Sequence, residues 1–233
     1  TAVNPELMNN DYRMSPVNTY MRATPDEIYR YFDDTTLSQT TIYGYASAYL
    51  YGWPNYDGDE VNIWGVQDVT YRLMPVPTQD TYEIRFLCSP TEDRGMYQVY
   101  FGTDPDNLMA AGIPLDLRMG GITFAHTGNP SHMGWESDTD DDDYNAEVDK
   151  KLRNNGFMKA PKVYCAGSAG AKLARTSSNL TRRILIRQHM DPDKTYYMRF
   201  KSCLELSSQL YMDFFELCPK SVYDNPEIPE DIW

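Results

Sequence analysis

Apolar and polar residues alternate with a period of two in many short segments of this chain, which is the pattern of half-buried β-strands. The clearest case is the stretch 82–88 (YEIRFLC), in which Tyr, Ile, Phe and Cys alternate with Glu, Arg and Leu. The segments predicted as strands are 42–51, 61–64, 69–73, 82–88, 96–101, 113–117, 180–187, 196–204 and 210–217. So many short strands with turn residues between them predict a mainly β fold, an antiparallel β-sandwich or jelly roll.

One or two short helices accompany these strands. Thr24 can cap a helix that has Pro25 at its first position and Glu27 three residues after the cap, and this helix is expected to end near residue 33. A second helix is predicted at about 145–153, ending towards Gly156.

The first predicted strand carries an unusual row of aromatic residues. Residues 42–53 (IYGYASAYLYGW) place aromatics at 43, 45, 49, 51 and 53, with small or aliphatic residues between them. A strand points alternate residues to opposite faces, so one face is almost entirely aromatic. We favour burial of this face in the core. An interface with a preceding domain and a platform for a ligand are the alternatives.

The pattern divides the chain into three parts. Residues 1–35 form an entry segment with the short helix, and we interpret them as the end of a preceding domain plus a linker. Residues 36–218 form the β-sandwich domain. Residues 219–233 contain three prolines and are expected to form an extended strap on the surface. The first residues also lack an initiating Met, which suggests a segment cut from a longer chain.

Charge and cysteine content narrow the classes of partner. The chain has 34 acidic and 21 basic residues and a net charge of −13, a field that repels nucleic acids and anionic membrane surfaces. It has no run of about 18 apolar residues that would span a membrane. The four cysteines are widely spaced, which disfavours a zinc site and leaves one disulfide open. Cys88 and Cys203 lie in apolar runs and are predicted to be buried.

An acidic run is the strongest candidate for a metal site. Asp138, Asp140 and Asp142 match the first, third and fifth positions of a calcium-binding loop. The pattern then fails, because Asp143 occupies the sixth position, which requires Gly, and Asp149 replaces the bidentate Glu at the twelfth. A solvated acidic loop is the favoured interpretation, with a structural calcium ion as the alternative, and no other cofactor is expected.

No pattern of catalytic residues emerges from the sequence. The three histidines are scattered, and neither an H-E-x-x-H helix nor a G-x-S-x-G elbow is present. We therefore predict a non-enzymatic protein and assign no catalytic residues.

The candidate ligand-binding residues lie in a loop after the aromatic row. Trp53 and Tyr56 can stack on a sugar ring, and Asp59 and Glu60 can accept hydrogen bonds from its hydroxyl groups. Trp135, beside the acidic run, is a further candidate. The alternative is that these rings pack their loops onto the sheet.

Several segments, in order along the chain, resemble one family. They are 58–63 (GDEVNI), 69–77 (VTYRLMPVP), 81–86 (TYEIRF), 93–101 (DRGMYQVYF), 153–159 (RNNGFMK) and 212–223 (MDFFELCPKSVY). Together they resemble the C-terminal module of fasciclin-domain surface lipoproteins of Bacteroides-type anaerobes. Residues 5–10 (PELMNN) are similar to the end of the fasciclin domain that precedes this module.

The resemblance implies a galactose-binding-like jelly roll held at the outer-membrane surface or in the periplasm. The lipid anchor would lie outside this chain, and the partners would be a glycan, proteins of a SusC/SusD-type nutrient importer and the preceding fasciclin domain. The expected function is a non-enzymatic cell-surface module that binds glycan or assists the importer. A structural or adhesion module that binds protein is the alternative, and a jelly-roll polysaccharide lyase or hydrolase is the third. The family supplies no ligand residues to transfer.

Overall fold

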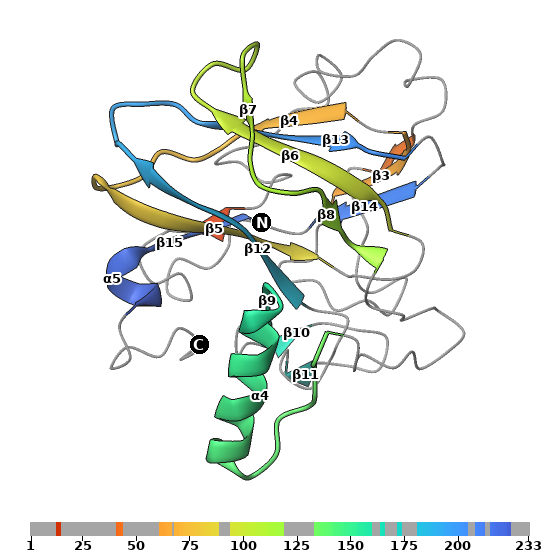
Figure 1. Cartoon of the computed structure of the whole chain (residues 1–233), viewed down its shortest axis with the longest axis vertical. Coiled ribbons are helices and arrows are strands. Elements are labelled where there is room, and N and C mark those ends of the chain that lie inside the picture. Colours follow the sequence, from red (N-terminus) through yellow and green to blue (C-terminus); the bar gives the residue numbers. More distant parts are fainter. Residues whose placement is uncertain are drawn as a thin grey trace.

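Two antiparallel sheets packed face to face form the body of the chain in the computed structural model (Figure 1). The structure describes residues 13–14, 41–43, 61–66, 68–88, 94–118, 133–159, 164–165, 172–173, 181–204, 208–212 and 215–224. The predicted mainly β fold, an antiparallel β-sandwich with short helices, is confirmed.

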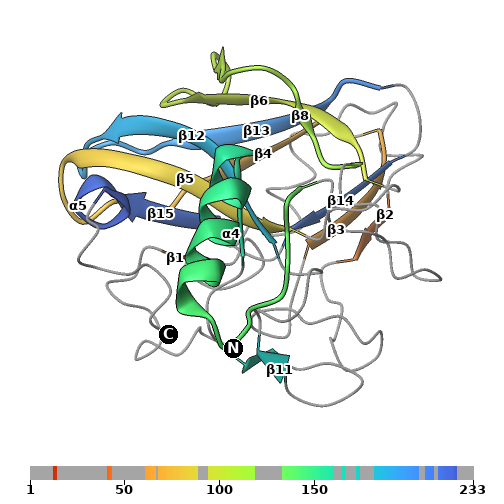
Figure 2. The same ribbon diagram turned by 60° about the horizontal axis from the view of Figure 1, so that its bottom comes forward.

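Each of these two sheets has five strands. Sheet 1 runs in the order β1 (Arg13–Met14), β15 (Phe215–Pro219), β5 (Asp80–Cys88), β12 (Thr181–Met190) and β9 (Phe157–Lys159). Sheet 2 runs in the order β4 (Asp68–Arg72), β13 (Tyr197–Ser202), β6 (Met96–Gly102) and β7 (Met109–Ala110). Its fifth strand, β8 (Leu115–Asp116), also pairs with β6. Figure 2 shows sheet 2 above sheet 1, with the helix α4 in front of sheet 1 and extending below it.

The remaining strands form two smaller sheets. One is three-stranded, with β14 (Ser208–Met212), β3 (Val61–Gly65) and β2 (Thr41–Tyr43), and the other pairs β10 (Tyr164–Cys165) with β11 (Lys172–Leu173).

The strand order is that of a jelly roll. The chain crosses from one large sheet to the other between β4 and β5, between β5 and β6, and again between β12 and β13. Sheet 1 therefore interleaves strands of both halves of the chain, as β1-β15-β5-β12, and sheet 2 does the same, as β4-β13-β6-β7. Except for β6 and the short strands that follow it, neighbouring strands come from distant parts of the sequence, which is the jelly-roll arrangement.

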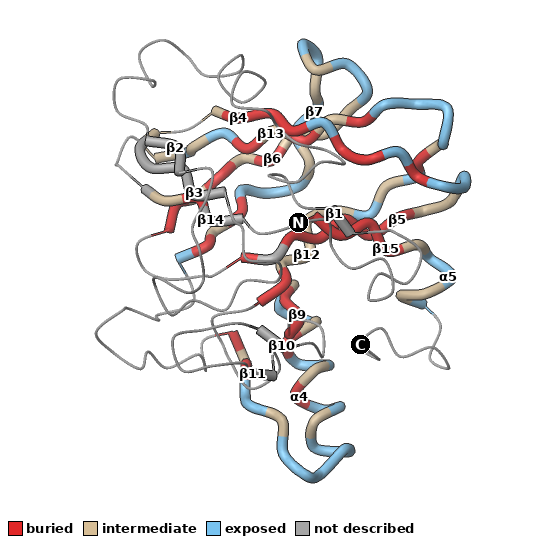
Figure 3. Tube along the Cα trace, turned by 180° about the vertical axis from the view of Figure 1, so that it is seen from behind, coloured by how far each residue is buried: buried red, intermediate tan, exposed pale blue. Residues whose placement is uncertain are grey.

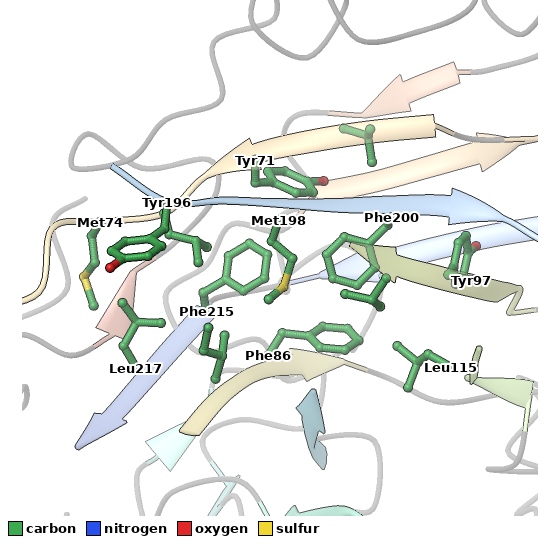
Figure 4. Close-up of a cluster of buried hydrophobic side chains, with 14 of the residues drawn as sticks. Tyr71, Met74, Phe86, Tyr97, Leu115, Tyr196, Met198, Phe200, Phe215 and Leu217 are labelled. Carbon is green, nitrogen blue, oxygen red and sulfur yellow. The ribbon is translucent and has the colours of Figure 1, made fainter. Parts of the chain in front are cut away.

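Aromatic rings from both sheets meet in the core (Figure 4). The ring centroids of Phe86 in sheet 1 and Phe200 in sheet 2 lie 5.7 Å apart, and those of Tyr71 and Phe215 lie 5.4 Å apart. Both contacts are edge-to-face, the geometry that the aromatic quadrupole favours. Strand alternation explains this core, because each strand sends every second residue inward.

The predicted strand 210–217 is wrong as a single element. Its first part is β14, which pairs with β3, and its second part is β15, which pairs with β5 in sheet 1. The physical reason is a shift of the apolar register by one residue. Leu210 is buried from an even position, whereas Phe215 and Leu217 are buried from odd positions. One continuous strand cannot send both sets to the same face.

The predicted strand 113–117 is also too long. Only Leu115–Asp116 forms a strand, β8, and Ile113 lies in the preceding turn with its residue surface 87% exposed. The other strand predictions that fall within the described residues are confirmed to within a few residues at each end.

The predicted second helix is confirmed as α4 (Asp142–Asn154). It begins inside the acidic run, where the Asp141 carboxylate accepts a hydrogen bond from the Tyr144 amide at 3.0 Å. Acidic residues suit this end of a helix and basic residues the other, where Lys151 and Arg153 lie. The chain leaves the helix through Gly156, whose φ of 80° favours glycine.

The C-terminal strap is only partly as expected. It starts with one helical turn, α5 (Lys220–Tyr223), and residues 225–233 lie outside the described residues. The predicted helix at residues 24–33, most of the aromatic row and the boundary at residue 35 also lie outside them. Within the described part of the chain, no helix is long and apolar enough to cross a membrane.

Of the two cysteines predicted to be buried, one is buried and the other is exposed. Cys88 is buried as expected, and burial raises the pKa of its thiol to about 12. Cys203 is exposed, contrary to the prediction, because β13 ends one residue before it. Cys88, Cys203 and Cys218 are free thiols.

Replacing Phe200 tests the core. Phe200→Ala removes a ring that contacts aromatic residues of both sheets, so the free energy of unfolding should fall by about 3–5 kcal/mol. Urea denaturation followed by fluorescence measures this loss. The exposed Met109→Ala is the control and should change stability little. An equal and small effect of both substitutions would contradict the assignment of the core.

Candidate functional site

The outer face of sheet 2 carries polar and aromatic side chains that alternate with the core residues. We call this surface the exposed sheet face. Its three central rows follow from the strand register and are Arg72–Tyr197–Gly102, Thr70–Arg199–Tyr100 and Asp68–Lys201–Gln98. These rows lie across β4, β13 and β6, the most regular part of sheet 2 (Figure 1).

Arg199 holds the centre of the exposed sheet face. Its Nε and Nη2 donate hydrogen bonds to the two carboxylate oxygens of Asp68, and its guanidinium lies over the Tyr100 ring, 5.6 Å from the ring centroid. The hydrogen bonds that Arg199 donates to Asp68 raise the pKa of Arg199 further above its ordinary value. A planar guanidinium held by a bidentate contact and a ring has little rotational freedom left.

Lys201 adds a second cation beside the same carboxylate. Its Nζ lies 3.7 Å from Asp68 Oδ2, and its side chain is 51% exposed. Asp68 therefore balances only one of the two cations that contact it. The group of these three side chains carries a net positive charge in a protein whose total charge is −13.

Tyr197 gives the exposed sheet face a second ring. It is half-buried and lies between Arg72 on β4 and Gly102 on β6. Gly102 has no side chain of its own, and Leu108 packs over it, with Leu108 Cδ2 3.2 Å from the position that a Cβ of Gly102 would take. A half-exposed ring on a rigid strand is a suitable platform for stacking.

The outer face of sheet 1 carries buried charged residues, and β15 and much of β5 are coloured as buried in Figure 3. It contains four charged residues that are 0% exposed, namely Glu83, Arg85, Arg182 and Glu216. We call them the buried charge network.

Close ion pairs hold the buried charge network together. Arg85 contacts both carboxylates, with Nε 2.6 Å from Glu83 Oε1 and Nη1 2.6 Å from Glu216 Oε1. Arg182 Nη1 lies 3.2 Å from Glu216 Oε1, and its Nε donates to the Lys159 carbonyl at 2.8 Å. These contacts join β5, β15, β12 and β9.

Two more arginines reach Glu83 from the edge of the network. Arg153, in the last turn of α4, donates to both carboxylate oxygens at 3.0 and 3.1 Å, and Arg187 donates from β12 at 2.8 Å. Burial raises the pKa of Glu83, but Arg85, Arg153 and Arg187 lower it by more, so that it lies below its ordinary value. The network therefore ties α4 to sheet 1 through an ionised carboxylate.

The predicted metal ligands do not converge. Asp138 accepts a hydrogen bond from Lys159 Nζ at 2.8 Å, Asp140 is exposed, and Asp142 lies in the first turn of α4. Among the described residues, no three His, Cys, Asp or Glu side chains are grouped to hold a metal ion. The expectation that the whole run is a solvated loop is also corrected, because Asp141 caps the helix and the next two aspartates belong to it.

Trp135 is buried in a small cluster rather than presented to solvent. It is 5% exposed and groups with Met133, Leu152 and Phe157. Lys159 Nζ lies 5.7 Å from the centroid of its ring. The structure thus uses Trp135 to pack α4 and β9 together, the alternative that the sequence left open.

The other four predicted ligand residues, Trp53, Tyr56, Asp59 and Glu60, lie outside the described residues. Sequence reasoning also missed both charged surfaces. A signal for the exposed sheet face was present, since Tyr197, Arg199 and Lys201 alternate with apolar residues in a predicted strand. The same alternation places Glu83 and Arg85 on one face of β5. The local sequence, however, does not show that other parts of the chain bury this face.

Comparison with known protein families, with curated proteins and with solved structures finds no match to this chain.

Replacing Glu216 tests the buried charge network. Glu216→Gln leaves Arg85 and Arg182 buried with less counter-charge, so the free energy of unfolding should fall by about 3–5 kcal/mol. Asp116→Asn is the matched control, because it breaks a solvent-exposed pair with Arg118 and should cost less than about 1 kcal/mol. Urea denaturation of both variants gives the comparison. Similar losses for both would refute a special role for the buried pairs.

The low pKa of Glu83 makes a prediction about pH. A carboxylate whose pKa is lower in the folded state stabilises the fold above its ordinary pKa, and this contribution disappears as the pH falls through the folded-state value. The stability difference between the wild type and Glu83→Gln should therefore be constant from about pH 7 to pH 5 and shrink below about pH 4. Urea denaturation across this pH range measures it. A difference that grows on acidification would be the wrong sign.

Proposed function

We propose that this protein is a non-enzymatic cell-surface module that binds glycan, and that the exposed sheet face is its binding surface. The observation that carries the proposal is the placement of Tyr100 and Tyr197 on adjacent strands of sheet 2, with Arg199 fixed between them. Binding sites need groups that are held in place before the ligand arrives, and a sheet supplies such rigidity.

The chemistry of this surface suits a sugar. A tyrosine ring offers a flat apolar surface to the C–H face of a pyranose, and its hydroxyl group can exchange hydrogen bonds at the rim. Arg199 and Lys201 are donors for sugar oxygens, and Asp68 and Gln98 supply acceptors. Such a shallow face with few rings would bind weakly to a single sugar, since ordering the ligand offsets much of the gain.

The buried carboxylates Glu83 and Glu216 suit a structural role rather than a catalytic one. Glu83 and Glu216 are the two carboxylates brought closest to a common partner, Arg85, and both are fully buried. An acid–base pair must reach its substrate, whereas these two carboxylates are fully buried and paired with arginines. Their arrangement suits stability.

The wider setting of the proposal comes from the resemblance to fasciclin-domain surface lipoproteins. It comprises a lipid anchor outside this chain, an outer-membrane or periplasmic location and an importer of the SusC/SusD type as partner. The loop with Trp53, Tyr56, Asp59 and Glu60 is the second contact that the proposal offers to a glycan.

A protein-binding adhesion module is the second candidate, and one observation favours it. Met109 and Ile113 are 75% and 87% exposed at the edge of sheet 2, where β7 has only two residues. Large exposed apolar residues at a sheet edge are a common feature of protein interfaces.

Affinity electrophoresis tests the proposed function. The protein should be retarded in a gel that contains a suitable polysaccharide from a broad panel, and Tyr197→Ala and Tyr100→Ala should each weaken the retardation roughly five- to tenfold through lost stacking. Tyr144→Ala is the matched control, because this exposed tyrosine lies on α4 and away from sheet 2. Trp53→Ala measures the contribution of the loop.

Two results would refute the proposal. One is the absence of retardation by every polysaccharide in the panel. The other is an equal loss for Tyr144→Ala and Tyr197→Ala, which would remove the exposed sheet face from the binding surface. Co-purification with an importer that needs no glycan would favour the protein-binding candidate.

A further inference from the structure

We propose that the exposed sheet face selects acidic polysaccharides, those built from uronic acids, over neutral ones. This inference rests on the proposed glycan-binding function and names the ligand class of the same surface. The juxtaposition that carries it is a pair of cations, Arg199 and Lys201, beside two tyrosine rings on one exposed sheet.

The local charge differs in sign from that of the whole protein. The chain carries −13, yet Arg199 and Lys201 share the single carboxylate of Asp68. The nearest other carboxylate in the register of this face is Asp116 on β8, and it is paired with Arg118. The described charges of this face therefore favour an anionic ligand.

Arg199 retains a donor for such a ligand. Its Nε and Nη2 are occupied by Asp68, and among the described residues no acceptor contacts its Nη1. Lys201 carries an ammonium on an exposed side chain, 3.7 Å from Asp68 Oδ2. One fixed guanidinium and one flexible ammonium together suit a carboxylate whose position varies between sugar residues.

The spacing places the rings and the cations within reach of one chain of sugars. Tyr197, Arg199 and Lys201 point to the same side of β13, and successive members of such a set lie about 6.5–7 Å apart. Tyr100 is the direct neighbour of Arg199 on β6. A sugar ring can therefore stack on Tyr197 while its own carboxylate, or that of the next residue, reaches Arg199 or Lys201.

The observations favour an acidic glycan over other polyanions. Exposed charges act over roughly 8 Å at physiological salt, so the local cations decide contact while the total charge of −13 opposes long-range attraction. Nucleic-acid binding depends mainly on that attraction to a dense row of phosphates. A polysaccharide with one carboxylate per ring, bound partly by stacking, depends on it less.

The experiment compares two polysaccharides with the same backbone. Polygalacturonate carries a carboxylate on every residue, and its fully methyl-esterified form carries none. We expect affinity electrophoresis to give at least roughly fivefold stronger retardation by the charged form, decreasing as salt is added. Lys201→Glu should remove most of this preference.

Lys194→Glu is the matched control. Lys194 has a similarly exposed side chain, undergoes the same change of charge and lies in the turn before β13, outside the exposed sheet face. It should leave the preference intact. The urea midpoint of each variant shows that the fold is retained, as expected for substitutions of exposed lysines.

Each outcome has a defined meaning. Equal retardation by the charged and esterified forms overturns the acidic ligand class but leaves the glycan-binding function standing. No retardation by these or by any neutral polysaccharide refutes both. An equal loss for Lys194→Glu and Lys201→Glu, or equal binding of single-stranded DNA or an acidic protein in competition, overturns the inference by showing that only net charge is recognised.

Discussion

The structure depends on one constraint, which is that the charges buried on sheet 1 must be neutralised where they lie. Moving an isolated ion out of water costs several kcal/mol, so Glu83 and Glu216 can be fully buried only because arginines contact them, and Arg85 contacts both. This requirement fixes more than local geometry. A slip of β15 by one residue would turn Glu216 into the aromatic core and Phe215 out of it. The same ion pairs that cost desolvation thus specify the register of sheet 1.

Because of this constraint, the outer faces of the two sheets have different roles. Both have outer faces with polar side chains, but sheet 1 satisfies its charges internally and draws α4 against itself through Arg153. Sheet 2 leaves its outer side chains partly in solvent, and there Asp68 contacts one cation more than it can balance. A jelly roll has two outer faces, and here one is used for cohesion. The other is the face to which we assign the proposed ligand, and its rigidity comes from the core that both sheets share.

The sequence predicts the strands well because a period of two is a local property. It also predicts α4, since an acidic first turn, a basic last turn and Gly156 all lie within the helix or next to it. It fails where the outcome depends on distant residues. Whether the polar face of β5 is exposed to solvent or buried depends on β12, β15 and α4, which lie about 50 to 130 residues further along the chain. Alternation alone predicts that Glu83 is exposed to solvent. For the same reason Trp135 was a ligand candidate, although its environment is set by Phe157 and Lys159.

Under the proposed function, Asp68 prepares the exposed sheet face for binding. Its carboxylate fixes Arg199 through two hydrogen bonds, and Arg199 in turn lies over Tyr100. The ordering entropy of the guanidinium is therefore lost during folding rather than during binding, where it would weaken affinity. Lys201 contacts the same carboxylate at 3.7 Å but remains half-exposed, so it can leave Asp68 for another anion at small cost. Asp68 thus holds Arg199 tightly and Lys201 loosely. In the proposed function, Arg199 sets the geometry of the binding surface and Lys201 adapts to the ligand.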